Sequence, residues 1–162
     1  MAYVDYSFYK DKYYGSAVPE SDFLRLSERA SDFLNVMTFD RLTCGLPADE
    51  RSVERIKKAA CALTEKFYEF SLAEKQALSA AMQSNKTQAG VSSGTVKSVS
   101  AGSESITYTS LSEMAGGAKQ WSATYAAVGN QEAMNKLLYD AAVPYLMGIK
   151  TDEGVPILYA GL

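Results

Sequence analysis

The chain has 162 residues, of which 47% are hydrophobic and 22% are charged, and its formal net charge is −3. A chain of this length buries roughly 68–70% of its unfolded surface, enough for one domain with a sizeable core. It has no histidine and only two cysteines, which excludes a Ser-His-Asp triad, a Cys-His pair and every His-ligated metal site. The acidic balance argues against binding nucleic acid through its phosphates. Residues 1–83 carry 24 of the 35 charged side chains.

The N-terminus and the hydropathy of the chain bear on where the protein is found. Residues 1–6, MAYVDY, lack the basic region and the continuous apolar stretch of a secretory signal peptide. No run approaches the roughly 20 apolar residues of a membrane-spanning helix. We therefore expect a soluble protein that is made in the cytoplasm and has no membrane partner.

Tyrosines mark the first expected helix. Tyr3, Tyr6, Tyr9 and Tyr13 recur at steps of three, three and four, which predicts a helix over about residues 3–14 with the rings on one face. Aromatic side chains at this spacing pack in the chain's own core or at a subunit interface, because a tyrosine ring has an apolar body and a polar tip. Both interpretations stay open for these rings.

Two longer amphipathic helices are expected next. Gly15 suits the left-handed conformation that follows a helix end. A helix is predicted over residues 20–37, where apolar residues recur at steps of three and four and acidic residues stand in the first turn. After a connection with glycine and proline, Asp49 or Ser52 can cap a helix predicted over residues 50–82.

The composition changes abruptly after these helices. Residues 84–118 contain 18 Ser, Thr or Gly among 35 residues, which is typical of a flexible linker. Within them, Val99, Ile106 and Tyr108 lie on either side of a turn that contains glycine, which favours a β-hairpin over about residues 95–109. A two-stranded hairpin is marginally stable alone, so it must dock on its own domain or on a neighbouring subunit.

The chain is expected to close with a helix and an extended apolar tail. The apolar pattern predicts a helix over about residues 131–147, in which Pro144 should cause a kink or an early end near Val143. Residues 151–162 are predicted to be extended. Their apolar side chains must be covered by the chain's own core or by a partner.

No sequence motif indicates catalysis. The phosphate-binding loop, the dinucleotide-binding glycine motif, the nucleophile elbow and the EF-hand loop are all missing. Cys44 and Cys61 are 17 residues apart, which fits neither a zinc site nor a redox motif. Cys61 lies in an apolar helical stripe and is interpreted as a buried thiol, although a disulfide with Cys44 stays open. The acidic pairs at 49–50 and 152–153 stand beside turns and are interpreted as cap or surface residues. We expect no enzyme activity, no catalytic residue, no cofactor and no metal.

Several segments in order resemble one protein family. The run YKDKYYGSAVPESDFLRLSERAS at residues 9–31 is followed by Thr-Phe-Asp-Arg-Leu at 38–42, VSAGSESITY at 99–108 and LYAGL at 158–162. In this order the chain resembles the small head–tail connector (adaptor) proteins of long-tailed bacteriophages. It departs from their pattern at Asp40, where glycine is common, and in a longer stretch between residues 110 and 130.

The resemblance implies a mainly α fold, a single domain over residues 1–162 that forms a small helical bundle with a β-hairpin insertion and an extended C-terminal tail. It also implies a ring, usually of twelve copies, beneath the portal of the capsid. Such a ring extends the DNA channel without specific DNA binding and joins a downstream head-closure or tail-completion protein, so that the protein is found in the virion after synthesis in the host bacterial cytoplasm. The implied portal contacts are Val155, Ile157, Leu158 and Tyr159, and the candidate subunit-interface residues are Tyr3, Tyr6, Tyr13, Val99, Ile106 and Tyr108.

A second hypothesis belongs to a different class. The tyrosine cluster could line a pocket in a small cytoplasmic helical module that binds a ligand or regulates a partner. The weakness of this hypothesis is that no convergent set of polar residues accompanies the aromatic ones in the sequence. An acidic channel wall, by contrast, suits a connector through which DNA must slide.

Overall fold

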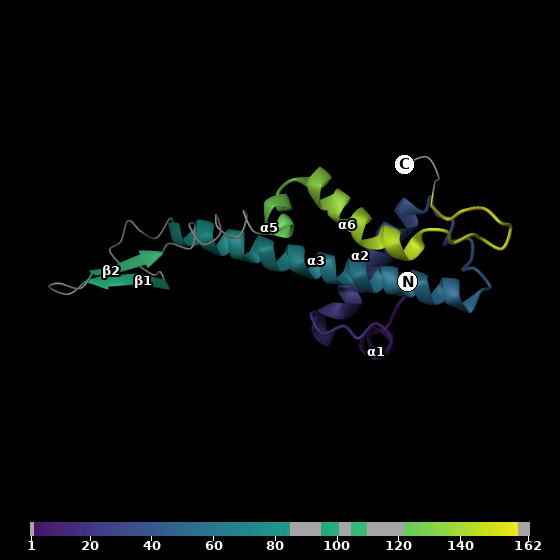
Figure 1. The fold of residues 1–162 in the computed structure, drawn as a ribbon, viewed down its shortest axis with the longest axis horizontal. Helices are drawn as coiled ribbons and strands as arrows, with labels where there is room; N and C mark the ends of the chain where they lie inside the picture. The colour runs from purple at the N-terminus through teal and green to yellow at the C-terminus, as the bar shows by residue number, and fades with distance from the viewer. Residues whose placement is uncertain (1, 85–94, 101–104, 110–121, 159–162) are drawn as a thin grey trace. The chain divides into compact units, whose positions relative to one another are not determined.

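The computed structural model describes residues 2–84, 95–100, 105–109 and 122–158. Most of these residues are helical, which confirms the mainly α class (Figure 1). The chain divides into two compact units, each described here by itself: unit 1 comprises Met1–Tyr68 and Asn135–Leu162, and unit 2 comprises Glu69–Met134. The single domain expected over residues 1–162 stays a prediction. The elements are α1 (Tyr6–Asp11), α2 (Glu20–Met37), α3 (Glu50–Ser84), β1 (Thr95–Ser100), β2 (Ser105–Thr109), α5 (Ala123–Ala127) and α6 (Gln131–Leu146).

The first helix is shorter than the predicted range of residues 3–14. Asp5 is the N-cap of α1, and its carboxylate accepts the backbone N–H of Phe8 at 2.8 Å. This cap fixes the start of the helix, because the N-cap residue itself has extended backbone angles. Tyr3 therefore precedes the helix, and its backbone N–H instead donates to Ser31 Oγ of α2 at 2.9 Å.

The turn after α1 corrects the role predicted for Gly15. The residue in the left-handed region is Tyr14, with a φ of +59°. Gly15 is needed for a different reason: a Cβ atom there would lie 2.0 Å from Cε2 of the Tyr9 ring. Only a residue without a side chain lets the backbone pass this close to the ring.

α2 has the bounds that the sequence predicts, and its C-terminus ends in a Schellman motif. The N–H of Asp40 donates to Asn35 O at 2.8 Å, and the N–H of Phe39 donates to Val36 O at 3.2 Å. Phe39 takes the left-handed position of this motif, with a φ of +53°, and Asp40 follows with a φ of +58°. Glycine is the usual residue at the left-handed position because it has no Cβ to clash. The positive φ of Asp40 also explains why glycine suits that position of the Thr-Phe-x-Arg turn. Glycine adopts such an angle most readily, and asparagine or aspartate tolerates it.

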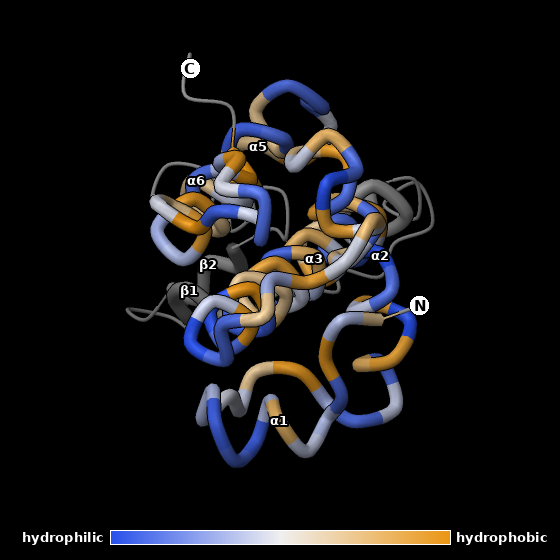
Figure 2. Tube along the Cα trace, turned by 90° about the vertical axis from the view of Figure 1, so that its right-hand side faces the viewer, coloured by the Kyte–Doolittle hydropathy of each residue, from blue (hydrophilic) through white to orange (hydrophobic). Residues whose placement is uncertain are grey.

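The core of unit 1 lies where α2, the N-terminal part of α3 and the C-terminal part of α6 face one another. In the end-on view of Figure 2, α3 passes between α1 and α6. The polar side chains in this core are satisfied locally, because the hydroxyls of Ser31, Thr38 and Thr64 each donate to the carbonyl four residues earlier. Fully buried core side chains include Leu26, Ala30 and Leu34 of α2, Ala59, Ala60, Cys61 and Leu63 of α3, and Ala142 and Leu146 of α6.

α6 continues through Pro144, so the predicted early end near Val143 is wrong. The helix reaches Leu146, and the N–H of Met147 still donates to Val143 O at 2.9 Å. The Arg55 guanidinium donates to Met147 O at 2.8 Å, which satisfies a carbonyl at the helix end. Proline is tolerated here because the hydrogen bonds beyond it re-form and α3 supplies a donor.

The predicted extended tail instead begins as a tight loop. The N–H of Thr151 donates to Val155 O at 2.8 Å, and the N–H of Ile157 donates to Ile149 O at 3.0 Å. We call residues 149–157 the tail loop. The loop turns at Gly154, whose φ is +82°, and Ile157 is fully buried. Of the apolar tail residues in this loop, Ile157 is covered by the chain's own core, whereas Val155 is 41% exposed.

Unit 2 contains the C-terminal part of α3, the two strands and α5. The strands pair antiparallel, with Val96 opposite Tyr108 and Val99 opposite Ile106 and Ser105. The turn between them lies outside the described residues, and a hairpin insertion stays a prediction. α5 is held to α3 by a hydrogen bond from Thr124 Oγ1 to Glu69 Oε2 at 2.9 Å and by another between Tyr125 and Gln76. Among the described helices, none has the length and apolar character needed to span a bilayer.

Candidate functional site

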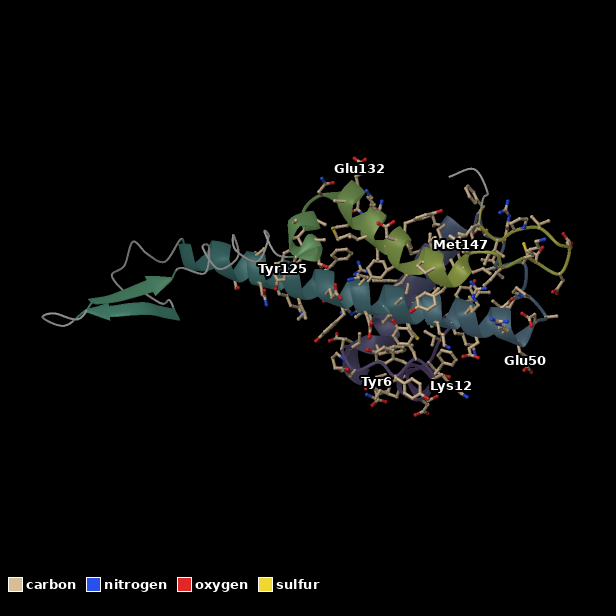
Figure 3. The ribbon with its side chains drawn as sticks, viewed as in Figure 1. Tyr6, Lys12, Glu50, Tyr125, Glu132 and Met147 are labelled. Atoms are coloured by element: carbon tan, nitrogen blue, oxygen red, sulfur yellow. The ribbon has the colours of Figure 1, made fainter. Side chains whose placement is uncertain are left out.

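The predicted tyrosine face is a packed aromatic cluster centred on Tyr9. The Tyr9 ring is fully buried, and its centroid lies 5.9 Å from that of Tyr6, 5.8 Å from that of Tyr13 and 5.0 Å from that of Phe23. These separations are typical of favourable aromatic pairs. Figure 3 labels Tyr6 on the purple segment that contains α1. The cluster anchors residues 2–18 to α2 and α3, so the core interpretation holds for Tyr9.

Glu65 of α3 ties the polar ends of two tyrosines together. The Tyr9 hydroxyl donates to Glu65 Oε1 at 2.8 Å and accepts the N–H groups of Ala17 and Val18. The Tyr13 hydroxyl donates to Glu65 Oε2 at 3.3 Å. Burial, with a smaller contribution from Glu65, raises the pKa of Tyr9 to about 12 and also raises the pKa of Tyr13. Both hydroxyls therefore stay protonated at neutral pH and act as structural donors.

Tyr3 and Tyr6, two predicted interface residues, line one groove at the N-terminal end of α2. The groove has a volume of ≈ 620 Å³, and its apolar lining includes Phe23 and Leu24. Leu24 is 69% exposed. Every charged side chain described along the groove is acidic, namely Asp5, Glu20 and Glu28. We call this feature the acidic groove. Sequence periodicity did not single out Leu24, because it lies off the buried stripe of α2.

The predicted portal contacts do not form one surface. Val155 is 41% exposed, Leu158 is half-buried and Ile157 is fully buried, while Tyr159 lies outside the described residues. Ile157 is a core residue in this structure, so its prediction as a partner contact is corrected. Its burial follows from the tail loop, which turns the chain back onto unit 1.

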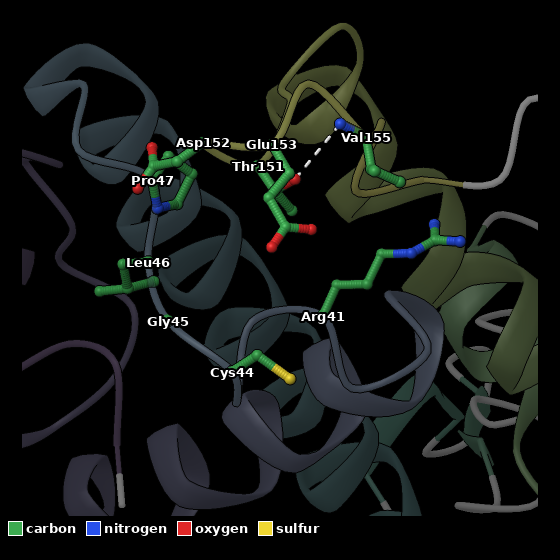
Figure 4. Close-up of a pocket in the computed structure, with 9 residues that line it drawn as sticks. All are labelled: Arg41, Cys44, Gly45, Leu46, Pro47, Thr151, Asp152, Glu153 and Val155. Atoms are coloured by element: carbon green, nitrogen blue, oxygen red, sulfur yellow. Dashed lines mark hydrogen bonds between the residues drawn. The ribbon is translucent and has the colours of Figure 1, made fainter.

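Arg41 fixes the end of the tail loop. Its guanidinium donates to Pro156 O at 2.8 Å and lies over the Phe39 ring at 5.7 Å. On the other side of the loop, Asp152 Oδ1 accepts the N–H of Ala48 at 2.8 Å. Between these contacts lies a cleft of ≈ 320 Å³, in which Arg41 faces Thr151, Glu153 and Val155 across the opening (Figure 4).

The remaining predicted interface residues lie in unit 2. Val99 is in β1, and Ile106 and Tyr108 are in β2, so the strand pairing brings Val99 and Ile106 opposite each other. Tyr13, by contrast, is in unit 1 and belongs to the aromatic cluster. The structure therefore gathers Tyr3, Tyr6 and Tyr13 in one region and places the strand residues in another unit.

The reactive groups that the sequence left open have structural roles. Asp49 accepts the N–H and the hydroxyl of Ser52, which makes it a cap of α3 as predicted. Both cysteines are free, and burial raises the pKa of Cys61 to about 12, so its thiol is not ionised at neutral pH. Within the described ranges, no group of three or more Cys, Asp or Glu side chains has the arrangement of a metal site.

Comparison of the chain with protein-family models, with curated proteins and with solved structures found no match. Any assignment of function therefore depends on the residues of this chain. Two aromatic residues, Tyr14 and Phe39, are 83% and 62% exposed and have a positive φ, a conformation in which a bulky residue is unusual. Sequence inspection could have flagged Phe39 only through the absence of a glycine after the apolar stripe of α2.

Proposed function

We propose that this chain is a subunit of a phage head–tail connector, a non-enzymatic protein that forms a ring, of twelve copies in the virion, beneath the portal. The ring would extend the DNA channel and join the capsid to a downstream head-closure or tail-completion protein. The first support for the proposal is the set of sequence segments that resemble connector proteins and occur in the same order along the chain. The mainly helical fold is compatible with it.

The observation that carries the proposal is the amount of large apolar surface that unit 1 leaves exposed. Tyr14, Leu24, Val36, Phe39 and Met147 are each more than 60% exposed, while the candidate reactive groups of this unit are engaged in caps and core hydrogen bonds. Single exposed apolar residues are ordinary, whereas exposed apolar residues that lie together mark an interaction site, and Val36 and Phe39 are exposed only three residues apart. This pattern favours an assembly role over catalysis.

The proposal requires a portal protein in the genome that encodes this chain, and the test is a binding experiment with that protein. Native mass spectrometry of the chain, of the portal ring and of their mixture should give a complex with a fixed number of copies of this chain per portal ring. A parallel capture on tagged portal should retain the chain in moderate salt. Failure of both measurements, with folded protein on each side, contradicts the connector proposal.

The second candidate, a ligand-binding helical module, is favoured by one observation: the acidic groove is lined by Tyr3 and Tyr6, as that hypothesis expects. Its ligand would be a cation with an apolar body, because the lining of the groove includes both acidic and apolar side chains. Recovery of such a small molecule with the purified monomer, together with no binding to portal, would favour this alternative.

A further inference from the structure

The cleft between the tail loop and the connection from α2 to α3 is held in shape at both ends. At one end the Arg41 guanidinium donates to Pro156 O at 2.8 Å, and at the other the N–H of Ala48 donates to Asp152 Oδ1 at 2.8 Å. The tail loop is also braced by its own backbone hydrogen bonds. The space of ≈ 320 Å³ between these two walls is therefore formed by the fold itself, and it falls at the lower end of the size range of small-molecule sites.

Two side chains of opposite charge line this cleft, and neither has a counter-ion among the described residues. The Arg41 guanidinium donates to two carbonyl oxygens of the tail loop, which do not neutralise its charge. The Glu153 carboxylate points from the tail loop toward the opposite wall (Figure 4), and no described residue forms a hydrogen bond or an ion pair with it. Asp152 differs from Glu153, because its carboxylate is already the acceptor for the N–H of Ala48. The cleft thus has one cation and one anion that are available to a ligand.

Much of the remaining lining is apolar and comes from both walls. Leu46 and Pro47 contribute from the connection, and Val155 contributes from the tail loop. Leu46 and Val155 are 38% and 41% exposed, so a ligand with an apolar body would remove part of their surface from water. A few placed polar groups in an otherwise apolar lining are typical of a site for a small molecule.

We infer that the cleft binds a small zwitterion with an aliphatic body, the chemical class of the free aliphatic α-amino acids. Its carboxylate would accept hydrogen bonds from Arg41, its ammonium group would donate to Glu153, and its aliphatic body would cover Leu46 and Val155. A ligand with a single charge would displace water from both charged groups and compensate only one of them, so both charges are needed. The inference goes beyond the proposed function and does not rest on it, because both walls of the cleft belong to unit 1 of one chain.

The experiment uses the full-length chain and three probes with the same aliphatic body. L-leucine has both charges, isoamylamine lacks the carboxylate, and 4-methylpentanoate lacks the ammonium group. Titrations followed through backbone amide NMR shifts measure the affinity and locate the site, since the shifts should concentrate at residues 44–47 and 151–155. We expect a Kd of about 1 mM or lower for leucine and affinities at least about tenfold weaker for the other two probes, the loss of one charge-assisted hydrogen bond.

Cys44 gives a second readout that does not depend on NMR. Its thiol is exposed and lines the cleft, whereas Cys61 is buried in the core. Alkylation by the neutral reagent iodoacetamide, followed by mass spectrometry, should therefore take place first at Cys44 and should become slower when leucine fills the cleft. Cys44→Ser should remove the fast reaction, which assigns it to this thiol.

Glu153→Gln tests the anionic half of the site. The amide keeps the shape of the side chain without its charge, and the fold should not depend on a carboxylate that no described residue contacts by a hydrogen bond or an ion pair. This variant should bind leucine at least about tenfold more weakly and should bind 4-methylpentanoate no more weakly than the wild type does. Glu132→Gln is the matched control, because Glu132 is an exposed acid of α6 outside the cleft, and its affinity for leucine should be unchanged. Denaturant unfolding checks that both variants are folded.

Three outcomes overturn the inference. The first is an absence of shifts at the amides of the cleft with leucine at about 10 mM, tenfold above the expected Kd. The second is equal affinity for the three probes, and the third is an unchanged affinity for leucine in Glu153→Gln. Failure of the proposed function is distinct from these results, since a chain that binds leucine but never binds portal refutes the connector proposal and leaves this site standing. A chain that binds portal but not leucine does the reverse.

Discussion

At the scale of single residues, the aromatic cluster depends on a close approach of the backbone at Gly15 to the Tyr9 ring, which only glycine permits. We predict that Gly15→Ala lowers the free energy of unfolding by about 3 kcal/mol, the upper part of the range for an overpacked core. The added Cβ would lie 2.0 Å from the Tyr9 ring. The ring cannot move aside without breaking its bonds to Glu65, Ala17 and Val18. Urea unfolding followed by circular dichroism measures the change.

The control for this prediction is Gly148→Ala. A Cβ there meets nothing within 4 Å, but the residue has a φ of +80°, so backbone strain alone should cost about 1 kcal/mol. A loss for Gly15→Ala no larger than that for Gly148→Ala would mean that the Tyr9 ring gives way to the added Cβ and that the close approach is not what makes glycine necessary.

The buried tyrosine hydroxyl makes stability depend on pH in the alkaline range. The pKa of Tyr9 is raised from 10.0 to about 12, first by burial. A phenol whose pKa is raised in the folded state deprotonates first in the unfolded chain, so its contribution is fully present below pH 10 and is lost as the pH rises from about 10 to about 12. We predict that Tyr9→Phe is less stable than the wild type at neutral pH by about 1–3 kcal/mol, because two backbone N–H groups lose their acceptor.

The same variant should show a shallower loss of stability between about pH 10 and pH 12, measured by denaturant unfolding at a series of pH values. Tyr14→Phe is the control for the loss of a tyrosine hydroxyl at an exposed position. An alkaline slope identical in Tyr9→Phe and the wild type would contradict the assignment to this hydroxyl.

At the scale of elements, Arg41 joins the turn after α2 to the tail loop. We predict that Arg41→Ala lowers the free energy of unfolding by about 1 kcal/mol, because the lost hydrogen bonds from the guanidinium are partly exposed. The larger effect should be local. Hydrogen exchange at the amides of Thr151 and Ile157, which close the loop, should accelerate at least tenfold when followed by mass spectrometry.

Arg25→Ala is the matched control for this effect, since Arg25 forms a surface ion pair with Asp22 at 3.2 Å within α2. Such a pair contributes little, so tail-loop exchange and stability should stay within about 0.5 kcal/mol of the wild type. Unchanged exchange in Arg41→Ala would show that the loop is held by its own backbone hydrogen bonds.

The elements also mark how far sequence reasoning reaches. Periodicity and caps are local signals, so the bounds of α2 and the cap at Asp49 could be predicted from neighbouring residues. The position of Tyr3 outside α1 and the burial of Ile157 could not, because they depend on partners far along the chain: Ser31 for Tyr3, and Arg41 for the carbonyls of the tail loop. Only part of the acidic groove could be predicted from the sequence. The tyrosine spacing indicated Tyr3 and Tyr6, but no pattern indicated Leu24.

At the scale of the whole molecule, the candidate contact surface of unit 1 lies at a different place from the one that the sequence predicts. The sequence placed it on the apolar C-terminal tail, whereas Ile157 is fully buried and the tail loop is bonded to the turn after α2. The large exposed side chains lie instead at the two ends of α2 and beyond the end of α6, where Figure 3 labels Met147.

Two truncations separate the structural part of the C-terminus from a partner-binding part. Ending the chain after Lys150 removes the tail loop and the core residue Ile157, so we predict a loss of about 3 kcal/mol in unfolding free energy, as for other large buried aliphatic side chains. Ending it after Leu158 removes only residues 159–162 and should leave that free energy unchanged. If the final segment binds portal, the shorter truncation should lose capture on tagged portal by at least tenfold while it still self-associates like the wild type. Full portal binding by the chain that ends at Leu158 would contradict a portal contact at Tyr159 and direct the search to Val155 and Met147.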